Sequence, residues 1–62
     1  MKITKKLTKM LSDKYGNKFE GYEGNDEMII IGINGNKYTI MFEELDTEEE
    51  ILEVLESMIN IS

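Results

Sequence analysis

The dipeptide Asn34-Gly35 constrains the fold of this chain more than any other feature, because it separates two runs that favour β-strands. The first run covers residues 28–33 and is rich in isoleucine, and the second covers residues 36–42 and contains Tyr38, Ile40 and Phe42. A two-residue type I′ turn needs positive φ at both central positions, which Asn and Gly tolerate best. The sequence therefore predicts a β-hairpin that turns at this dipeptide.

The turn also fixes the register of the hairpin, since a two-residue loop pairs Ile31 with Tyr38 and Ile29 with Ile40. Successive side chains of a strand point to opposite faces, so a slip of one residue would scatter the apolar ones. The register gathers the β-branched and aromatic side chains on one face, namely Ile29, Ile31, Ile33, Tyr38, Ile40 and Phe42. The opposite face then carries Met28, Ile30, Gly32, Lys37, Thr39 and Met41.

A third, weaker strand is expected over residues 18–23, before a turn at residues 24–26. Phe19 and Tyr22 are three residues apart, so a regular strand would place them on opposite faces. A bulge near Gly21 would bring both aromatic rings to the same face.

Both ends of the chain have helical periodicity. Apolar residues recur at i, i+4, i+7 and i+8 near the start and predict a helix over residues 4–15, with Gly16 as its C-terminal cap; they are Ile3, Leu7, Met10 and Leu11. The last helix opens at residues 46–50, where Asp46…Glu49 and Thr47…Glu50 both have the spacing of a capping box. Its apolar residues cover about half of the helical wheel, wider than the ~100° stripe of an ordinary surface helix. They are Ile51, Leu52, Val54, Leu55, Met58, Ile59 and Ile61.

The order of these elements predicts an α+β fold, with one αβββα domain over residues 1–62. We expect a three-stranded antiparallel meander with both helices packed on its apolar face. A domain of 62 residues buries only about 60% of its unfolded surface, so a further source of stability is expected. Disulfides and a structural zinc site are excluded because the chain has no cysteine or histidine. Oligomerisation is the source that remains.

Composition also limits the chemistry of the chain. Without histidine and cysteine, the common catalytic triads and thiol nucleophiles cannot be built. The acidic side chains cluster on a turn and a helix start, where they do not form a cleft that separates their pKa values. We therefore expect no enzyme, no cofactor and no metal site.

Surplus apolar surface is the main indication of function, since the predicted two layers cannot cover all of it. Contiguous exposed apolar patches mark interaction sites. The sequence predicts a non-catalytic protein-interaction module that forms a homodimer or binds an unidentified protein partner. Its apolar candidate residues are Met28, Ile30 and Met41 on the open sheet face, and Ile51, Leu52, Val54, Leu55, Met58 and Ile59 on the last helix.

Charge is distributed unevenly along the chain. Residues 1–18 have a net charge of +5 and residues 19–62 a net charge of −11. This asymmetry allows attraction between the helices within the fold, a head-to-tail contact between copies, or separate partners for the two surfaces. In the acidic segment 43–50, the residues expected to contribute selectivity and solubility are Glu43, Glu44, Glu48 and Glu49.

An alternative function also follows from the acidic segment, because its carboxylates could imitate a row of phosphates. The helix end Lys14-Tyr15, the isoleucine-rich strand and residues 35–40 make the chain similar in architecture to small acidic αβββα proteins of bacteriophages, including some anti-CRISPR proteins. That resemblance implies an inhibitor that mimics DNA charge and blocks a host nucleic-acid-binding enzyme. No functional residue is carried over from it.

Other classes of partner are disfavoured. The net charge of −6 disfavours direct nucleic-acid binding, although the lysines of the first helix leave a weak, salt-dependent contact open. The longest apolar run, residues 28–31, is far shorter than the roughly 20 residues of a membrane-spanning helix. The first helix needs its apolar stripe for the core, so we expect no membrane association and a cytoplasmic location.

Overall fold

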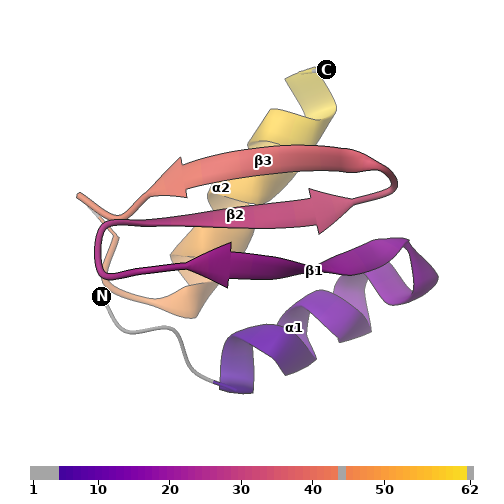
Figure 1. Cartoon of the computed structure of the whole chain (residues 1–62), viewed down its shortest axis with the longest axis horizontal. Coiled ribbons are helices and arrows are strands. Elements are labelled where there is room, and N and C mark those ends of the chain that lie inside the picture. Colours follow the sequence, from indigo (N-terminus) through magenta and orange to yellow (C-terminus); the bar gives the residue numbers. More distant parts are fainter. Residues whose placement is uncertain (1–4, 44, 62) are drawn as a thin grey trace.

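The computed structural model describes residues 5–43 and 45–61 and has the αβββα order that the sequence predicts (Figure 1). Helix α1 (Lys5–Tyr15) leads through a 3₁₀ turn at Gly16–Lys18 into the sheet. The strands are β1 (Phe19–Gly24), β2 (Met28–Ile33) and β3 (Asn36–Met41), and helix α2 (Glu48–Ile61) follows. The sheet is an antiparallel meander in the order β1-β2-β3. Both helices pack on the same face of the sheet, as expected.

The predicted hairpin register is confirmed. Ile31 pairs with Tyr38 and Ile29 with Ile40. Asn34 and Gly35 have φ values of 53° and 83°, the left-handed conformation that a type I′ turn requires.

The predicted bulge in β1 is also confirmed. The register shifts between Phe19 and Gly21, and Gly21 has a φ of 120°, which glycine alone adopts readily. The shift brings Phe19 and Tyr22 to the core side of the sheet, where their rings stack with centroids 6.3 Å apart.

A single hydrophobic core lies between the sheet and the two helices. Helix α1 contributes two fully buried leucines at i and i+4, and α2 contributes three buried side chains. The buried residues are Leu7, Leu11, Ile29, Ile31, Ile33, Ile40, Phe42, Ile51, Leu52 and Leu55. The sheet face predicted to be apolar is therefore the one that the helices cover.

The start of α2 uses one of the two predicted capping boxes. The Glu50 backbone N–H donates to Thr47 Oγ1 at 3.3 Å, and the Asp46 N–H donates to Glu50 Oε1 at 3.1 Å. The Asp46…Glu49 alternative is not used, because the Glu49 carboxylate points to α1 instead. At the other end of the chain, α1 begins at Lys5 as described, and the predicted positions Ile3 and Thr4 lie outside the described residues.

Candidate interaction surface

The open face of the sheet keeps the three apolar residues that the sequence placed there. Ile30 is 37% exposed and Met41 is 47% exposed, and Met28 beside them is half-buried. Met28 and Met41 are direct cross-strand partners, and Ile30 lies two residues along β2 from Met28. These side chains form one small apolar patch on the face that neither helix covers.

The same face is hollowed beside this patch, where glycines replace larger side chains. Gly21 and Gly32 are register partners, and together they leave an open depression of about 370 Å³. Glu20 and Glu23 line it on the β1 side, and Lys37 lines it on the β3 side. Such a shallow, solvent-open depression is unlike the enclosed clefts that bind small molecules.

The predicted interaction residues of α2 divide into two groups. Ile51, Leu52 and Leu55 are buried in the core, which corrects their assignment to an interaction surface. They face the sheet because half of the wide apolar stripe is needed to fill the space beneath β2 and β3. The remaining three, Val54, Met58 and Ile59, are half-buried at the margin of the core.

Ile61 is an exposed apolar residue outside the predicted interaction residues. It is 85% exposed at the end of α2. At 100° per residue, Ile61 falls close to Val54 and Met58 on the helical wheel. The helical periodicity of the sequence could therefore have predicted that Ile61 shares their face. We call Val54, Met58 and Ile61 the α2 flank.

The α2 flank lies on the side of the helix that faces away from α1. The Glu49 and Glu56 side chains mark the opposite side, since both form ion pairs with α1. Val54 itself lines a hollow of about 290 Å³ beside β3, together with Thr39, Ile40, Met41, Glu43 and Leu45. Figure 1 shows the C-terminal end of α2 projecting past β3.

Strand β3 forms one free edge of the sheet, and its register shows which backbone groups point outward. The residues next to a two-residue turn form a hydrogen-bonded pair, and such pairs alternate with non-hydrogen-bonded ones along the ladder. The Phe42 N–H donating to the Glu27 carbonyl at 2.9 Å fits this alternation. The N–H and C=O groups of Lys37, Thr39 and Met41 therefore point away from β2, and no other described strand pairs with them.

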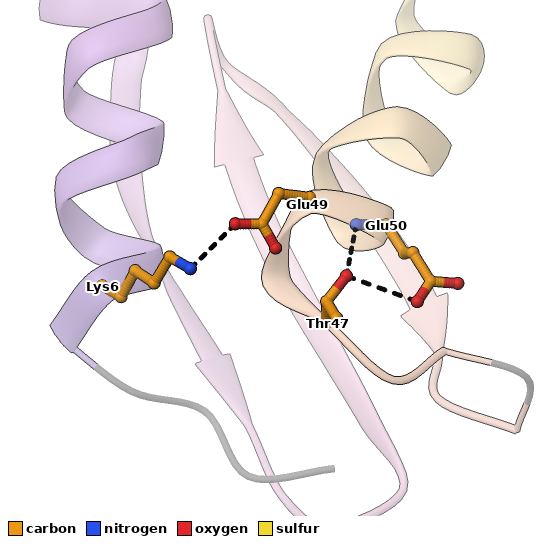
Figure 2. A network of polar contacts seen from close by, with 4 residues as sticks. All are labelled: Lys6, Thr47, Glu49 and Glu50. Carbon is orange, nitrogen blue, oxygen red and sulfur yellow. Dashed lines mark hydrogen bonds and ion pairs between the residues drawn. The ribbon is translucent and has the colours of Figure 1, made fainter.

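The acidic segment 43–50 is partly used within the domain. Lys6 Nζ lies 2.8 Å from Glu49 Oε1, and Glu50 contributes to the cap with Thr47 (Figure 2). The hydrogen bond and charge of Lys6 lower the pKa of the Glu49 carboxyl, and Glu49 raises the pKa of Lys6. Glu43 is exposed and Glu48 half-buried, and Glu44 lies outside the described residues.

A second ion pair also joins the helices, with Lys14 Nζ 2.8 Å from Glu56 Oε2. The hydrogen bond that Lys14 donates to the Glu56 carboxylate raises the pKa of Lys14. Two of the lysines of the basic N-terminal part thus attract acids of α2 inside one domain, the first of the three arrangements that the charge asymmetry allowed. All four side chains are largely exposed, so these pairs orient the helices more than they stabilise them.

One buried polar atom lies under the end of α1. The Tyr15 hydroxyl is shielded from solvent and has no hydrogen-bond partner among the described residues. Burial raises the pKa of this hydroxyl. Because solvent does not reach the oxygen, the Tyr15 hydroxyl is not part of the candidate interaction surface.

The described residues contain neither a metal-binding cluster nor a membrane-spanning helix. Within residues 5–43 and 45–61, no three acidic side chains are close enough together to hold a metal ion, and no helix is long and apolar enough to cross a membrane. Comparison with family models, curated proteins and solved structures finds no match for this chain.

Proposed function

We propose that this chain is a non-catalytic protein-interaction module that associates with a second copy of itself. The observation that carries the proposal is apolar surface left outside a filled core. Ile30 and Met41 remain exposed on the sheet, and Ile61 remains exposed on α2. Met41 and the α2 flank lie on the two sides of the free edge of β3, so association at this edge would cover both.

The size of the surface sets the expected affinity. Three strands about 4.8 Å apart and about 20 Å long present a face of roughly 300 Å², well below the ~800 Å² per partner of a standard interface. The open face alone therefore supports only weak association. A surface that adds the β3 edge and the α2 flank is larger and is the better candidate.

The acidic-mimic alternative receives less support from these contacts. Glu49 and Glu50 have partners within the domain, which leaves fewer carboxylates in segment 43–50 to face a basic groove. The two functions respond differently to salt. Binding through a row of carboxylates weakens steeply with ionic strength, whereas apolar association changes little.

Sedimentation equilibrium tests the proposal. We expect the average mass to rise toward a dimer as the protein concentration increases from about 10 µM to about 1 mM, in line with a small interface. Replacing Met41 with threonine should weaken association, because the side chain is 47% exposed beside the β3 edge. The matched control, Glu23→Thr, changes an exposed residue of β1 and should leave association unchanged. A wild-type chain that stays monomeric over this range would contradict the proposal.

A further inference from the structure

We infer that the dimer forms by antiparallel pairing of β3 with β3 of a second copy, about a twofold axis at Ile40, which makes a continuous six-stranded sheet. This inference rests on the proposed self-association and gives its geometry. It starts from the backbone of β3, a six-residue strand with an uninterrupted register. The outward N–H and C=O groups of Lys37, Thr39 and Met41 are the groups that a neighbouring strand would use.

Charge selects the register. β3 ends at Met41, and Glu43 lies in the turn just after it, which the Leu45 N–H closes by donating to the Phe42 carbonyl at 3.0 Å. With the axis at Ile40, Lys37 comes beside this turn of the partner and its Glu43, and the twofold repeats the contact on the other side. Both side chains are exposed, and neither takes part in an ion pair found among residues 5–43 and 45–61. Opposite charges placed across two strands stabilise the pairing, whereas like charges destabilise it.

The remaining cross-strand pairs agree with this register. Thr39 lies opposite the partner's Met41 on the open face, where the outward backbone groups of the two residues can exchange hydrogen bonds. On the covered face, Tyr38 lies opposite the partner's Phe42. Ile40 meets the partner's Ile40 on the axis, and aromatic and β-branched pairs of this kind favour strand pairing.

Neighbouring registers lose the charge pair. An axis at Thr39 would place Lys37 opposite the partner's Met41, and an axis at Met41 would place Lys37 past the end of the partner's β3, away from Glu43. Both keep the outward groups of the two strands aligned, so the hydrogen bonds alone do not choose among the three. The attraction between Lys37 and the partner's Glu43 favours the axis at Ile40.

The α2 flank supplies the second layer of the contact. α2 passes beneath β3, and its C-terminal end projects beyond the edge at which the partner would add (Figure 1). Val54, Met58 and Ile61 lie on that side, while Glu49 and Glu56 are held on the other side by their ion pairs with α1. The pairing would therefore cover apolar side chains without bringing those glutamates of the two copies together, and it accounts for the exposure of Ile61.

Charge reversal at the two positions tests the register. Lys37 and Glu43 of one chain lie near opposite ends of β3, and the extended backbone from residue 37 to residue 42 alone spans about 17 Å, which exceeds the Debye length of about 8 Å in physiological salt. Compensation between them must therefore act between copies. Lys37→Glu and Glu43→Lys should each weaken dimerisation about fivefold or more in sedimentation equilibrium, and the double variant should return to within about twofold of wild type.

Edge-specific variants provide an independent test. The Thr39 N–H points away from β2, so Thr39→Pro removes a donor needed by the partner and leaves the ladder with β2 intact. Dimerisation should fall at least about tenfold, and Thr39→Val, which keeps the N–H, should dimerise like wild type. Ile30→Thr should also dimerise like wild type, since edge pairing leaves the centre of the face uncovered. Circular dichroism checks that each variant is folded. If Thr39→Pro does not fold, the charge-reversal variants provide the test of edge pairing.

The outcomes separate the inference from the function. A wild-type chain that dimerises, with single charge reversals that have no effect or a double variant that is not restored, overturns the register and leaves self-association standing. Loss of dimerisation in Ile30→Thr overturns edge pairing in favour of face-to-face contact. A wild-type chain that is monomeric at about 1 mM overturns both.

Discussion

The two edges of this sheet differ in how they are protected, although both belong to the same three strands. At the β1 edge, the bulge at Gly21 breaks the regular backbone, and α1 lies alongside (Figure 1). A hydrogen bond of 2.8 Å between the Tyr22 hydroxyl and Thr8 Oγ1 ties that helix to the strand. At the β3 edge, the register is regular through residue 41 and a hollow lies between the strand and α2.

This difference shows how a small domain can protect one edge and leave the other available for pairing. Bulges, covering helices and charged side chains are the usual means of preventing edge-to-edge pairing. The β1 edge has a bulge and a helix, and the β3 edge has only Lys37. In the proposed dimer Lys37 has the partner's Glu43 beside it. The charge of Lys37 would therefore favour the register about Ile40 and disfavour the others.

Truncating a buried leucine of α1, the helix that covers the β1 edge, is expected to have the largest effect on stability. Leu11 is fully buried beneath α1, and Leu11→Ala should lower the free energy of unfolding by about 2–5 kcal/mol, measured by urea denaturation. The exposed neighbour Ser12 offers a control, since Ser12→Ala should change it by less than about 0.5 kcal/mol. A loss below about 1 kcal/mol for Leu11→Ala would mean that α1 is not anchored in the core as described.

The bulge can be tested with a pair of glycines that face each other across β1 and β2. Gly21 has a φ of 120°, so Gly21→Ala should destabilise the fold by about 1–3 kcal/mol. Gly32 lacks this strain, and a Cβ there would lie an ordinary 3.5 Å from the Glu20 Cβ. Gly32→Ala should therefore change stability by less than about 1 kcal/mol. Equal effects in the two unfolding curves would argue against the bulge.

Two tyrosines beside α1 should respond differently to loss of the hydroxyl. Tyr22→Phe removes the bond to Thr8 and should destabilise the domain by about 0.5–1 kcal/mol. Tyr15→Phe removes a buried hydroxyl that has no described partner, so it should be neutral or stabilising by up to about 1 kcal/mol. Thermal unfolding of both variants measures this difference in stability. A larger loss of stability for Tyr15→Phe than for Tyr22→Phe would show that the Tyr15 hydroxyl is hydrogen-bonded.

The smallest expected effect concerns the ion pair between α1 and α2. Lys6 lowers the pKa of Glu49 from its ordinary value of 4.5, so the pair stabilises the fold above that value and loses its contribution as the pH falls through the folded pKa. The effect on stability is small because both side chains are exposed. NMR titration should show the Glu49 pKa moving up in Lys6→Met and staying in place in Lys9→Met. An unchanged pKa in Lys6→Met would exclude the contact in solution.

The sequence allowed the hairpin and the covered face to be predicted because both depend on local rules. Asn34-Gly35 fixes the turn, and the alternation of side chains fixes which face is buried. The bulge at Gly21 followed from the spacing of two aromatic residues. These features needed no knowledge of how the helices are arranged.

The interaction surface could be predicted only in part, because it depends on that arrangement. The helical wheel of α2 shows a wide apolar stripe but not which part faces the sheet, so the sequence predicts Leu55 as an interaction residue, whereas the structure buries it in the core. Ile61 is not among the predicted interaction residues, although it is exposed. The partner of Glu49 was likewise unpredictable, since it depends on how α1 and α2 lie beside each other.

Concentration-dependent hydrogen exchange tests the central claim, that the β3 edge is free in one copy and pairs in the dimer, most directly. The account predicts that the amide protons of Thr39 and Met41 exchange quickly in dilute protein and become protected as the concentration rises. The amides of Tyr38 and Ile40, which already face β2, serve as internal references for the same strand. If exchange at Thr39 and Met41 does not depend on concentration while the protein dimerises, β3 is not the strand that pairs.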